Sequence, residues 1–534
     1  MIQFYKGVFK SIDLIKFEQY DISCFHSDKY FIVDLKSDYN IEFIKFNTIK
    51  DIEVKIFFSS DSIKWVDCYD ITNKNLYEFY INTNTQNKYR FIKINIDYCL
   101  IKNQLIDIYV RKYPGLMIAA RSDGFGARLM PILNAMYLAE YTGFKFGFVW
   151  KKVAYDDTSL KQFEDNDLAG IYLSNEKYIF SQEFIDEYSY TDKIESNIRI
   201  DKKKTLKELT EDMVKIWGNY IDYDTTRKIF GAKIFKEYPR LWSKIKFSPR
   251  IQEIIKLSNN TAKEAFDNSF IAIHIRSGDI VYDERIRKLG VGFGKAMPVE
   301  IAMELIEKNK KENKNIVLFG DDLSELRALK QYYHVSIIED FIHELTGIDR
   351  IIFEINFMSK AEVIYSGGSS FARVASYIGL GKEPTFYQNV FSNDEIIKIL
   401  TKQNSMLKFH KLQKFYSLIH RAILQIQSDK CKYSILDVLD NAKKLDCGVS
   451  DGLCGVLTFY CLLKKEDWIF LEDIFIKYPE YTNLVFNLKY GIFGREVVKL
   501  FFIYEYNFKC NKIKKFIALL KIEFFIEYYT LLYS

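Results

Sequence analysis

The chain has little cysteine and histidine, and neither residue is arranged as in a metal site. Its eight cysteines form no Cys-x-x-Cys pair, and none lies between positions 100 and 430. The six histidines include no His-Glu-x-x-His motif, and His343, within an acidic stretch, has no paired ligand spacing around it. These absences argue against a zinc site and against a disulfide framework, so we predict reduced thiols and no metal.

Long apolar runs and a strong net charge are also missing. No stretch of about 18 uncharged apolar residues is present, which gives no candidate for a membrane-spanning helix. The N-terminus is interrupted by Lys6, Lys10 and Asp13 and lacks the continuous apolar segment of a secretory signal, so a cytoplasmic location is expected. The net charge of +5 is too small to indicate nucleic acid as a partner.

Proline and glycine are scarce, at 7 and 24 residues, and the chain is 48% hydrophobic and 28% charged. This balance excludes a long disordered or collagen-like segment. A chain of 534 residues is too long for one hydrophobic core, so several folded domains are expected.

Residues 1–113 predict an all-β sandwich, because segments rich in β-branched and aromatic residues alternate with Asp, Asn and Ser turns. The expected strands are residues 30–35, 41–46, 51–58 and 89–96. The stretches 54–65 and 89–94 resemble the paired strands of discoidin-type (F5/8 C-like) sandwiches. That resemblance implies a module that holds carbohydrate, and a packing or assembly role is the alternative.

After Pro114 the pattern predicts a Rossmann-like domain over residues 114–250. An apolar strand at 116–120 runs into a glycine-rich loop, a helix and a second strand at 145–150, which is a β-loop-α-β unit. A further helix is expected over 206–220, and two prolines, Pro239 and Pro249, bracket the segment between domains.

Residues 251–405 predict a second Rossmann-like domain, since short apolar strands alternate with amphipathic helices as in a parallel sheet. The expected strands are residues 270–275, 315–319, 335–338, 362–365 and 385–387. Two such domains in tandem are expected to leave a cleft between them.

Residues 406–534 carry only helical patterns and predict an all-α appendage. In the last segment, lysines at 512, 514, 515 and 521 alternate with apolar residues. A basic amphipathic helix of this kind can lie on an anionic membrane surface, and packing within a helix bundle explains the same pattern. Peripheral association with the inner membrane therefore stands as one of two interpretations.

The strongest chemical signal is His274-Ile-Arg276-Ser-Gly278-Asp279, at the end of an apolar strand. Ligands of open α/β sheets bind at the carboxyl ends of strands. Arg276 would offer a forked guanidinium to a diphosphate, Gly278 would let the backbone approach closely, and Asp279 could fix the arginine or contact substrate. The alternative is a structural Arg–Asp pair that ends the strand.

Two further polar segments follow later strands of the same domain. Asp321 and Asp322 can accept hydrogen bonds from a guanine edge or a ribose hydroxyl. Ser369 and Ser370, with the backbone N–H groups that open the next helix, can form an anion cradle.

The glycine-rich loop reads Arg121-Ser-Asp123-Gly124-Phe-Gly126-Ala-Arg128-Leu129. A dinucleotide fingerprint would carry a third glycine where Leu129 follows Arg128, so the loop argues against NAD.

Together these motifs resemble those of the α1,2/α1,6/protein-O-fucosyltransferase superfamily, over roughly residues 115–405. H-x-R-x-G-D resembles its first signature, residues 317–322 and 366–375 its second and third, and the loop its G-x-G-x-x-L. The resemblance implies a two-Rossmann (GT-B) inverting enzyme that uses a GDP-sugar without a metal or another cofactor. The implied nucleotide-sugar contacts are Gly124, Gly126, Arg128, His274, Gly278, Asp279, Asp321, Asp322, Ser369, Ser370, Phe371 and Arg373.

Inverting transfer needs positive charge at the leaving GDP and a base for the acceptor hydroxyl. Arg276 is predicted to supply the charge. The resemblance leaves two candidate bases: Glu284, five residues beyond Asp279 as in the α1,6 branch, and Asp123, which precedes the glycine-rich loop as in a protein-O-fucosylating branch. Asp123 is slightly favoured, because the cleft would place that loop opposite the diphosphate.

The nature of the sugar is less constrained than the nucleotide. Ser277 replaces the second of two adjacent arginines found in the α1,2 branch, so fucose or a related GDP-linked sugar such as a heptose is expected. The predicted acceptor is a hydroxyl of a bacterial-type surface glycan, as in capsule synthesis. The alternatives are a non-catalytic carbohydrate-binding or assembly protein with a degenerate core, and a capsule-modifying transferase with a different activated donor.

Overall fold

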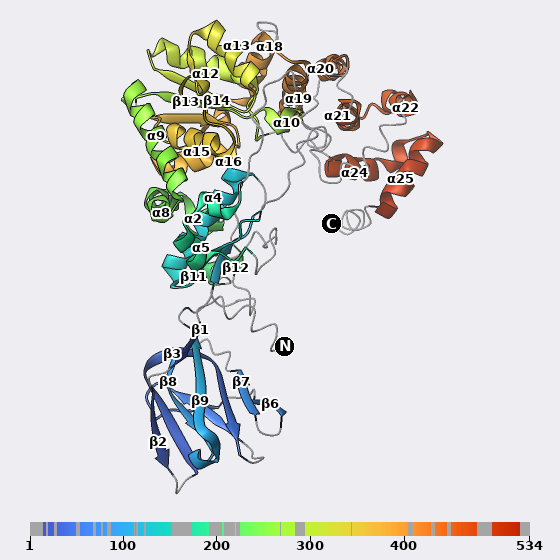
Figure 1. Cartoon of the computed structure of the whole chain (residues 1–534). Helices are drawn as coiled ribbons and strands as arrows, with labels where there is room; N and C mark the ends of the chain where they lie inside the picture. The colour runs from blue at the N-terminus through green and yellow to red at the C-terminus, as the bar shows by residue number, and fades with distance from the viewer. Residues whose placement is uncertain are drawn as a thin grey trace.

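The structure is a computed structural model. It describes residues 14–17, 20–25, 29–49, 54–67, 71–75, 78–82, 87–111, 113, 116–121, 124–151, 174–191, 205–207, 219–220, 225–267, 269–282, 294–342, 344–403, 409–428, 433–445, 450–477 and 494–523. Figure 1 shows a β region at one end, a small and a larger α/β unit above it, and a helical region beside the larger unit.

The N-terminal region is an antiparallel assembly of nine strands folded around one apolar core. Its longest strand, β3 (Tyr30–Thr48), pairs with β2 and β8 through its first part and with β7 and β9 through its second. The sequence predicted two strands here, whereas the chain continues through a register shift near Lys36, whose φ is 67°. The other strands are β1 (Leu14–Phe17), β2 (Asp21–Phe25), β4 (Ile56–Ser59), β5 (Val66–Asp67), β6 (Ile71–Asn75), β7 (Glu78–Asn82), β8 (Tyr89–Ile94) and β9 (Ile101–Arg111).

The first α/β unit has a parallel sheet of order β11-β10-β12. Strand β10 (Leu116–Ala119) leads into the long helix α2 (Phe125–Thr142), which ends at Gly143 in the left-handed conformation, and β11 (Lys145–Phe148) follows. The helix expected over 206–220 is wrong at its end, because β12 (Asn219–Tyr220) pairs with β10. The remaining helices are α4 (Glu176–Ile179), α5 (Gln182–Tyr188), α7 (Thr225–Phe230), the 3-10 turn Gly231–Glu237 and α8 (Tyr238–Lys244).

The second α/β unit has a five-stranded parallel sheet of order β15-β14-β13-β16-β17. The strands are β13 (Ile271–Ile275), β14 (Ile316–Gly320), β15 (Ser336–Ile337), β16 (Val363–Ser366) and β17 (Thr385–Phe386), close to the segments expected from the sequence. The helices are α9 (Pro249–Phe266), α10 (Gly278–Tyr282), α12 (Val299–Lys311), α13 (Leu323–Tyr333), α14 (Glu339–Ile342), α15 (Gly347–Met358), α16 (Ser370–Leu380), α17 (Tyr387–Val390) and α18 (Asn393–Gln403).

One buried apolar cluster runs through both α/β units. It contains Leu129 and Phe148 of the first unit together with Ala272, Phe353 and Ala375 of the second. Burial of such side chains is the main favourable term in folding. The shared core therefore holds the two units in a fixed relation.

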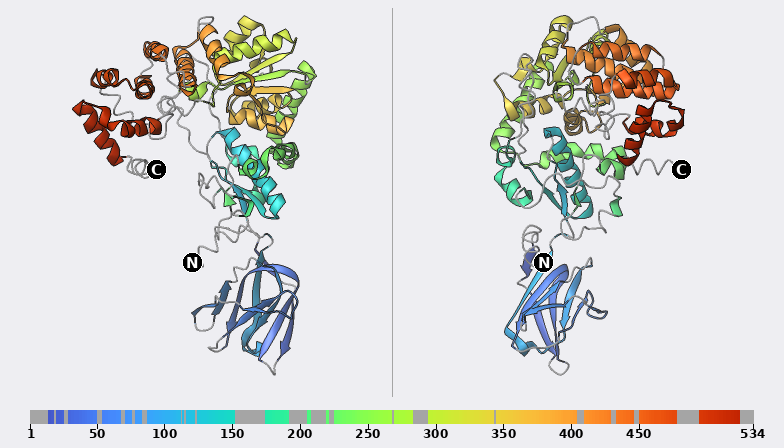
Figure 2. Two further views of the ribbon diagram at one scale, coloured as in Figure 1. Left: turned by 180° about the vertical axis from the view of Figure 1, so that it is seen from behind. Right: turned by 90° about the vertical axis from the view of Figure 1, so that its right-hand side faces the viewer.

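The C-terminal region is helical in the residues described, as expected from the sequence. Figures 1 and 2 place its helices along one side of the second α/β unit. No described helix is long and apolar enough to cross a membrane. The helices are α19 (Lys411–Gln427), α20 (Tyr433–Lys443), α21 (Ser450–Lys465), α22 (Trp468–Lys477), α24 (Gly494–Ile503) and α25 (Asn511–Glu523).

Candidate functional site

The strand order of the second unit creates a point where the chain reverses direction across the sheet. From β13 the chain moves outward through β14 to β15 and then returns to add β16 on the other side of β13. His274 is in register with Ser366, and Ile275 with Gly320. The residues that follow these strands therefore meet at one edge of the sheet, which is where ligands bind in open α/β folds.

Arg276 follows β13 at this edge and pairs with Asp321, which follows β14. The arginine Nη1 lies 2.7 Å from the Asp321 Oδ2, and the backbone N–H of Ser277 donates to the Asp321 Oδ1 at 2.8 Å. A Cβ at Gly278 would overlap the same carboxylate, so a larger residue there would have to displace the Asp321 side chain. The sequence suggested that Asp279 fixes the arginine or contacts substrate, and this stays a prediction because the side chain of Asp279 is not described. Asp321 is a partner of the arginine that the sequence did not suggest.

The Arg276 side chain remains 24% exposed at the sheet edge. A guanidinium has five N–H donors in a planar fork, a geometry that suits the oxygens of a carboxylate or a phosphate. Arg276 is thus held in place at a partly exposed position of the sheet edge.

Asp322 has a different role from the one expected. Its side chain is 2% exposed, and it caps α13 by accepting from the Glu325 N–H at 3.1 Å. The Tyr282 hydroxyl donates to its Oδ2 at 2.6 Å, and the Ser324 hydroxyl to its Oδ1 at 2.7 Å. Because both oxygens are occupied within the protein, the expected contact of Asp322 with a guanine or a ribose has no support in the structure.

His274 is buried beneath the site and stacks on Phe371, with ring centroids 5.5 Å apart. Burial, with a smaller contribution from the charge of Arg276, lowers the pKa of His274 to about 3. The imidazole is therefore neutral near pH 7. Of these two residues, only Arg276 brings positive charge to this edge.

The glycine-rich loop of the first unit meets the third motif of the second. A Cβ at Gly126 would lie 2.9 Å from the Phe371 Cα and 2.9 Å from the Ser370 carbonyl carbon. Gly126 lies in the first turn of α2, and Ser370 and Phe371 open α16. The N-termini of two helices thus converge here, and their first-turn N–H groups and dipoles favour an anion.

Serine and glycine line the start of α16. Ser369 is the N-cap residue, is 5% exposed and makes no side-chain capping bond. The Gly368 N–H donates to the Gly294 carbonyl at 2.7 Å, and a Cβ at Gly367 would lie 2.6 Å from the Lys295 carbonyl. The sequence did not assign these two glycines a role, although a Ser-Gly-Gly-Ser run at a strand end signals close backbone packing.

Two of the predicted nucleotide contacts are directed into the protein. Arg128 is 2% exposed, donates to the Lys151 carbonyl at 2.7 Å and lies over the Trp150 ring. Arg373 pairs with Glu383, with Nε 3.3 Å from Oε2. Their partners give both arginines a structural role at α2 and α16, and Arg128 is too buried to reach a ligand in this arrangement.

Three sequence predictions lie outside the described residues: the candidate bases Asp123 and Glu284, and His343. Within the described ranges, no group of three or more His, Cys, Asp or Glu side chains could hold a metal ion. Metal independence stays a prediction.

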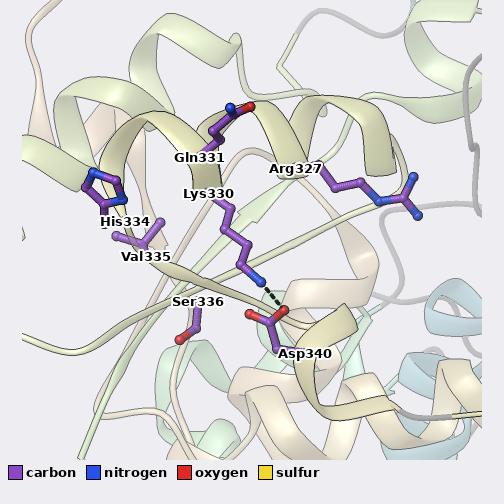
Figure 3. A pocket seen from close by; sticks show the side chains of 7 residues that line it. All are labelled: Arg327, Lys330, Gln331, His334, Val335, Ser336 and Asp340. Atoms are coloured by element: carbon purple, nitrogen blue, oxygen red, sulfur yellow. Dashed lines mark hydrogen bonds and ion pairs between the residues drawn. The ribbon is translucent and has the colours of Figure 1, made fainter.

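An open hollow of about 540 Å³ lies away from these motifs, between α13 and β15 (Figure 3). Ion pairs involve its charged side chains: Lys330 with Asp340, and Arg327 with Glu339 at 2.8 Å. None of the predicted site residues lines it. The lining residues are Arg327, Lys330, Gln331, His334, Val335, Ser336 and Asp340.

No protein-family model and no curated protein matches the chain. Among solved structures, the fucosyltransferase NodZ from Bradyrhizobium is 16% identical, with 49% of this chain and 92% of that chain covered and a TM-score of 0.31. POFUT1 in complex with GDP is 10% identical, with 51% of this chain and 98% of that chain covered and a TM-score of 0.27. CBM32-1 from a family 31 glycoside hydrolase of Clostridium perfringens is 20% identical, with 19% of this chain and 82% of that chain covered and a TM-score of 0.13. The chain is similar to these proteins only distantly.

Proposed function

We propose that the chain is a glycosyltransferase that moves a sugar from a GDP-sugar to a hydroxyl of a glycan acceptor, with inversion and without a metal. The observation that carries the proposal is the position of Arg276. It is fixed by Asp321 at 2.7 Å at the reversal point of the parallel sheet, and the start of α16, which follows strand β16 of that sheet, contacts Gly126 at the start of α2.

The leaving group is the reason this arrangement suits the reaction. The acceptor oxygen attacks the anomeric carbon, the bond from that carbon to the diphosphate breaks, and GDP departs with the electron pair. Arg276 and the helix-terminal N–H groups would stabilise the negative charge that develops on the diphosphate. A carboxylate would take the acceptor proton, and Asp123 and Glu284 are the candidates.

The sugar is proposed as fucose or a related GDP-linked sugar such as a heptose, and the acceptor as a bacterial-type surface glycan. Incubating the protein with a panel of GDP-sugars and acceptor oligosaccharides, followed by mass spectrometry, tests both. A mass gain equal to one sugar residue identifies the donor. A chain that binds glycans without any mass gain would instead be a non-catalytic assembly protein, and a gain of another mass would indicate a different donor.

The N-terminal β region is proposed to contact the glycan. The Lys93 Nζ lies 4.1 Å from the centre of the Tyr30 ring and 5.8 Å from that of Trp65, and all three side chains are partly exposed. Aromatic rings beside a cation offer stacking and hydrogen-bonding surface to sugars. Replacing Trp65 by alanine should weaken glycan binding while leaving GDP binding unchanged, and equal glycan binding by both proteins would refute this role.

Helix α25 is proposed to associate with an anionic membrane surface, which would place a cytoplasmic enzyme at the inner membrane. Its Ile513 and Phe516 are buried, whereas Leu519 and Ile522 are 55% and 76% exposed and follow the exposed Lys515 on the same face. A face of lysine and apolar side chains suits a lipid surface. Co-sedimentation with phosphatidylglycerol vesicles should fall for Lys515→Glu, and no binding by the wild type would refute the role.

A further inference from the structure

The helical region shares a core with the segment that follows Arg276. Helix α10 begins at Gly278, and its Ile280, Val281 and Tyr282 pack in one buried cluster with Leu412 and other apolar residues of α19 to α21. The first motif is therefore held from a part of the chain that lies outside both α/β units.

A buried polar network accompanies this apolar contact. The Gln413 Nε2 on α19 donates to the Glu325 Oε2 at 2.7 Å and to the Asp322 Oδ2 at 3.2 Å. The Ser277 hydroxyl donates to the same Glu325 oxygen at 2.9 Å, and the Tyr282 hydroxyl to the same Asp322 oxygen at 2.6 Å. All five side chains are at most 3% exposed.

The chemistry of the network explains why an amide stands at position 413. Both of its partners are carboxyl oxygens, so the NH₂ group, with two N–H donors, must face them. Burial and the neighbouring charge of Asp322 raise the pKa of Glu325 well above its ordinary value. A neutral double donor lets two acidic side chains lie together in a buried place without an added charge.

Ser277 connects the network to Arg276 and Asp321, which we call the donor site because they lie where the GDP-sugar is proposed to bind. This residue follows Arg276, its N–H bonds the Asp321 carboxylate that pairs with the arginine, and its hydroxyl bonds Glu325. The Val281 N–H also donates to the Ser277 carbonyl at 2.8 Å, which ties the start of α10 to the same residue. A residue that holds Glu325 and Asp322 in place therefore also fixes the backbone at Ser277, which positions the Arg276 guanidinium.

We propose that Gln413 is a positioning residue of the donor site: by bridging Asp322 and Glu325, it holds residues 276–282 so that Arg276 faces the diphosphate. The inference rests on the proposed function for its ligand. Helix α19 would then help to form the donor site, and the helical region would have a function besides packing.

A purely structural role for Gln413 is the competing explanation, and α19 supplies a matched control. One turn further along, the Ser417 hydroxyl donates to the buried Glu300 Oε2 at 2.7 Å. That bond also joins α19 to a buried acid of the second unit, but this acid lies on α12 and not in the first motif. Loss of either bond is expected to cost stability, because each leaves a buried polar group without a partner.

The test compares Gln413→Met, which keeps length and removes both donors, with Ser417→Ala. Amide hydrogen exchange of residues 276–282, measured without nucleotide, should accelerate in Gln413→Met and stay at the wild-type rate in Ser417→Ala. GDP affinity should weaken by about 10-fold in Gln413→Met, because ordering the loosened residues 276–282 on binding then costs about as much as one hydrogen bond to a charged group. It should weaken less than about twofold in Ser417→Ala, because the bond lost there does not hold that segment.

A second variant keeps the test open if Gln413→Met does not fold. In Gln413→Glu the new acid has to ionise beside Asp322, Glu325 and the nearby Asp321 and Glu300, so GDP affinity should weaken as pH rises from about 6 to about 8. Because Glu300 ionises over the same range in every variant, the loss in Gln413→Glu should clearly exceed the loss in the wild type and in Ser417→Ala, and equal losses would overturn the positioning role.

Each outcome bears on a separate claim. Unchanged exchange and affinity in Gln413→Met, or equal losses in Gln413→Met and Ser417→Ala, would overturn the positioning role. A wild type that binds no GDP would overturn the proposed function. The exchange rates would still decide whether Gln413 holds residues 276–282.

Discussion

Gly126 of the first α/β unit and Phe371 of the second meet so closely that a Cβ on the glycine would lie 2.9 Å from the Phe371 Cα. Real Cβ atoms essentially never approach backbone atoms this closely. The contact joins the starts of α2 and α16, whose first-turn N–H groups belong to the proposed anion site. Substitution at Gly126 therefore reports on the geometry of the proposed anion site.

Gly126→Ala is expected to weaken GDP binding by about 10-fold or more, because the two helix starts must move apart and their N–H groups no longer converge. Gly124→Ala makes the same chemical change two residues earlier, where nothing lies within 4 Å of the added Cβ, and it keeps the backbone N–H. Its affinity should stay within about threefold of the wild type. Calorimetric titration of both variants checks the pair, and similar losses in both would argue against the helix contact as the cause.

Arg276→Lys is expected to reduce the transfer rate by about 100- to 1,000-fold, because an ammonium cannot make two parallel bonds to a diphosphate. Arg327→Lys is the matched control, since Arg327 forms an ion pair of similar length with Glu339, 2.8 Å, beside the hollow in Figure 3. That variant should keep wild-type turnover in a GDP-release assay. Near-normal turnover of Arg276→Lys would mean that Arg276 only ends the strand.

The two candidate bases can be separated by paired amide substitutions. If Asp123 takes the acceptor proton, Asp123→Asn should abolish transfer with GDP affinity nearly unchanged, and Glu284→Gln should be mild. Transfer rates and GDP affinities measured on both variants show which substitution impairs transfer more. The reverse order would assign the base to Glu284, and equal small losses would exclude both carboxylates.

The buried Glu300 predicts a stability that depends on pH. Burial raises its pKa to about 7, from an ordinary value of 4.5. Because the folded pKa is the higher one, the favourable contribution of Glu300 is complete below about pH 4.5 and is lost as pH rises through about 7. Glu300→Gln cannot ionise and keeps an oxygen that can accept from Ser417.

The glutamine variant should therefore gain stability relative to the wild type as pH rises, by about 1–3 kcal/mol between pH 5 and pH 8. Urea denaturation at both pH values measures the difference. If the stability gained by Glu300→Gln over the wild type is the same at pH 5 and pH 8, or larger at pH 5, Glu300 is not the group that ionises.

The sequence predicted the parallel strands and the place of Arg276, because apolar strands followed by Gly and charged residues are local patterns. It did not predict Asp321 as the partner of the arginine, since that contact depends on which strands are neighbours. Asp322 was expected at the nucleotide, although Asp322-Leu-Ser-Glu325 has the spacing of a helix-capping box. The sequence did not predict a role for Gln413 at the site. A single glutamine in an amphipathic helix is usually a solvent-exposed residue, and the contacts of Gln413 with Asp322 and Glu325 depend on how the domains pack.

A titration of GDP and of GMP into the wild type and Arg276→Ala, all in excess EDTA, tests whether Arg276 binds the diphosphate without a metal. If Arg276 binds the diphosphate without a metal, the wild type should prefer GDP over GMP by about 10-fold or more, and Arg276→Ala should lose most of that preference while still binding GMP. A wild type that binds neither nucleotide until Mg²⁺ or Mn²⁺ is added would show that a metal holds the diphosphate, and a variant that keeps the full preference for GDP would show that Arg276 does not bind it.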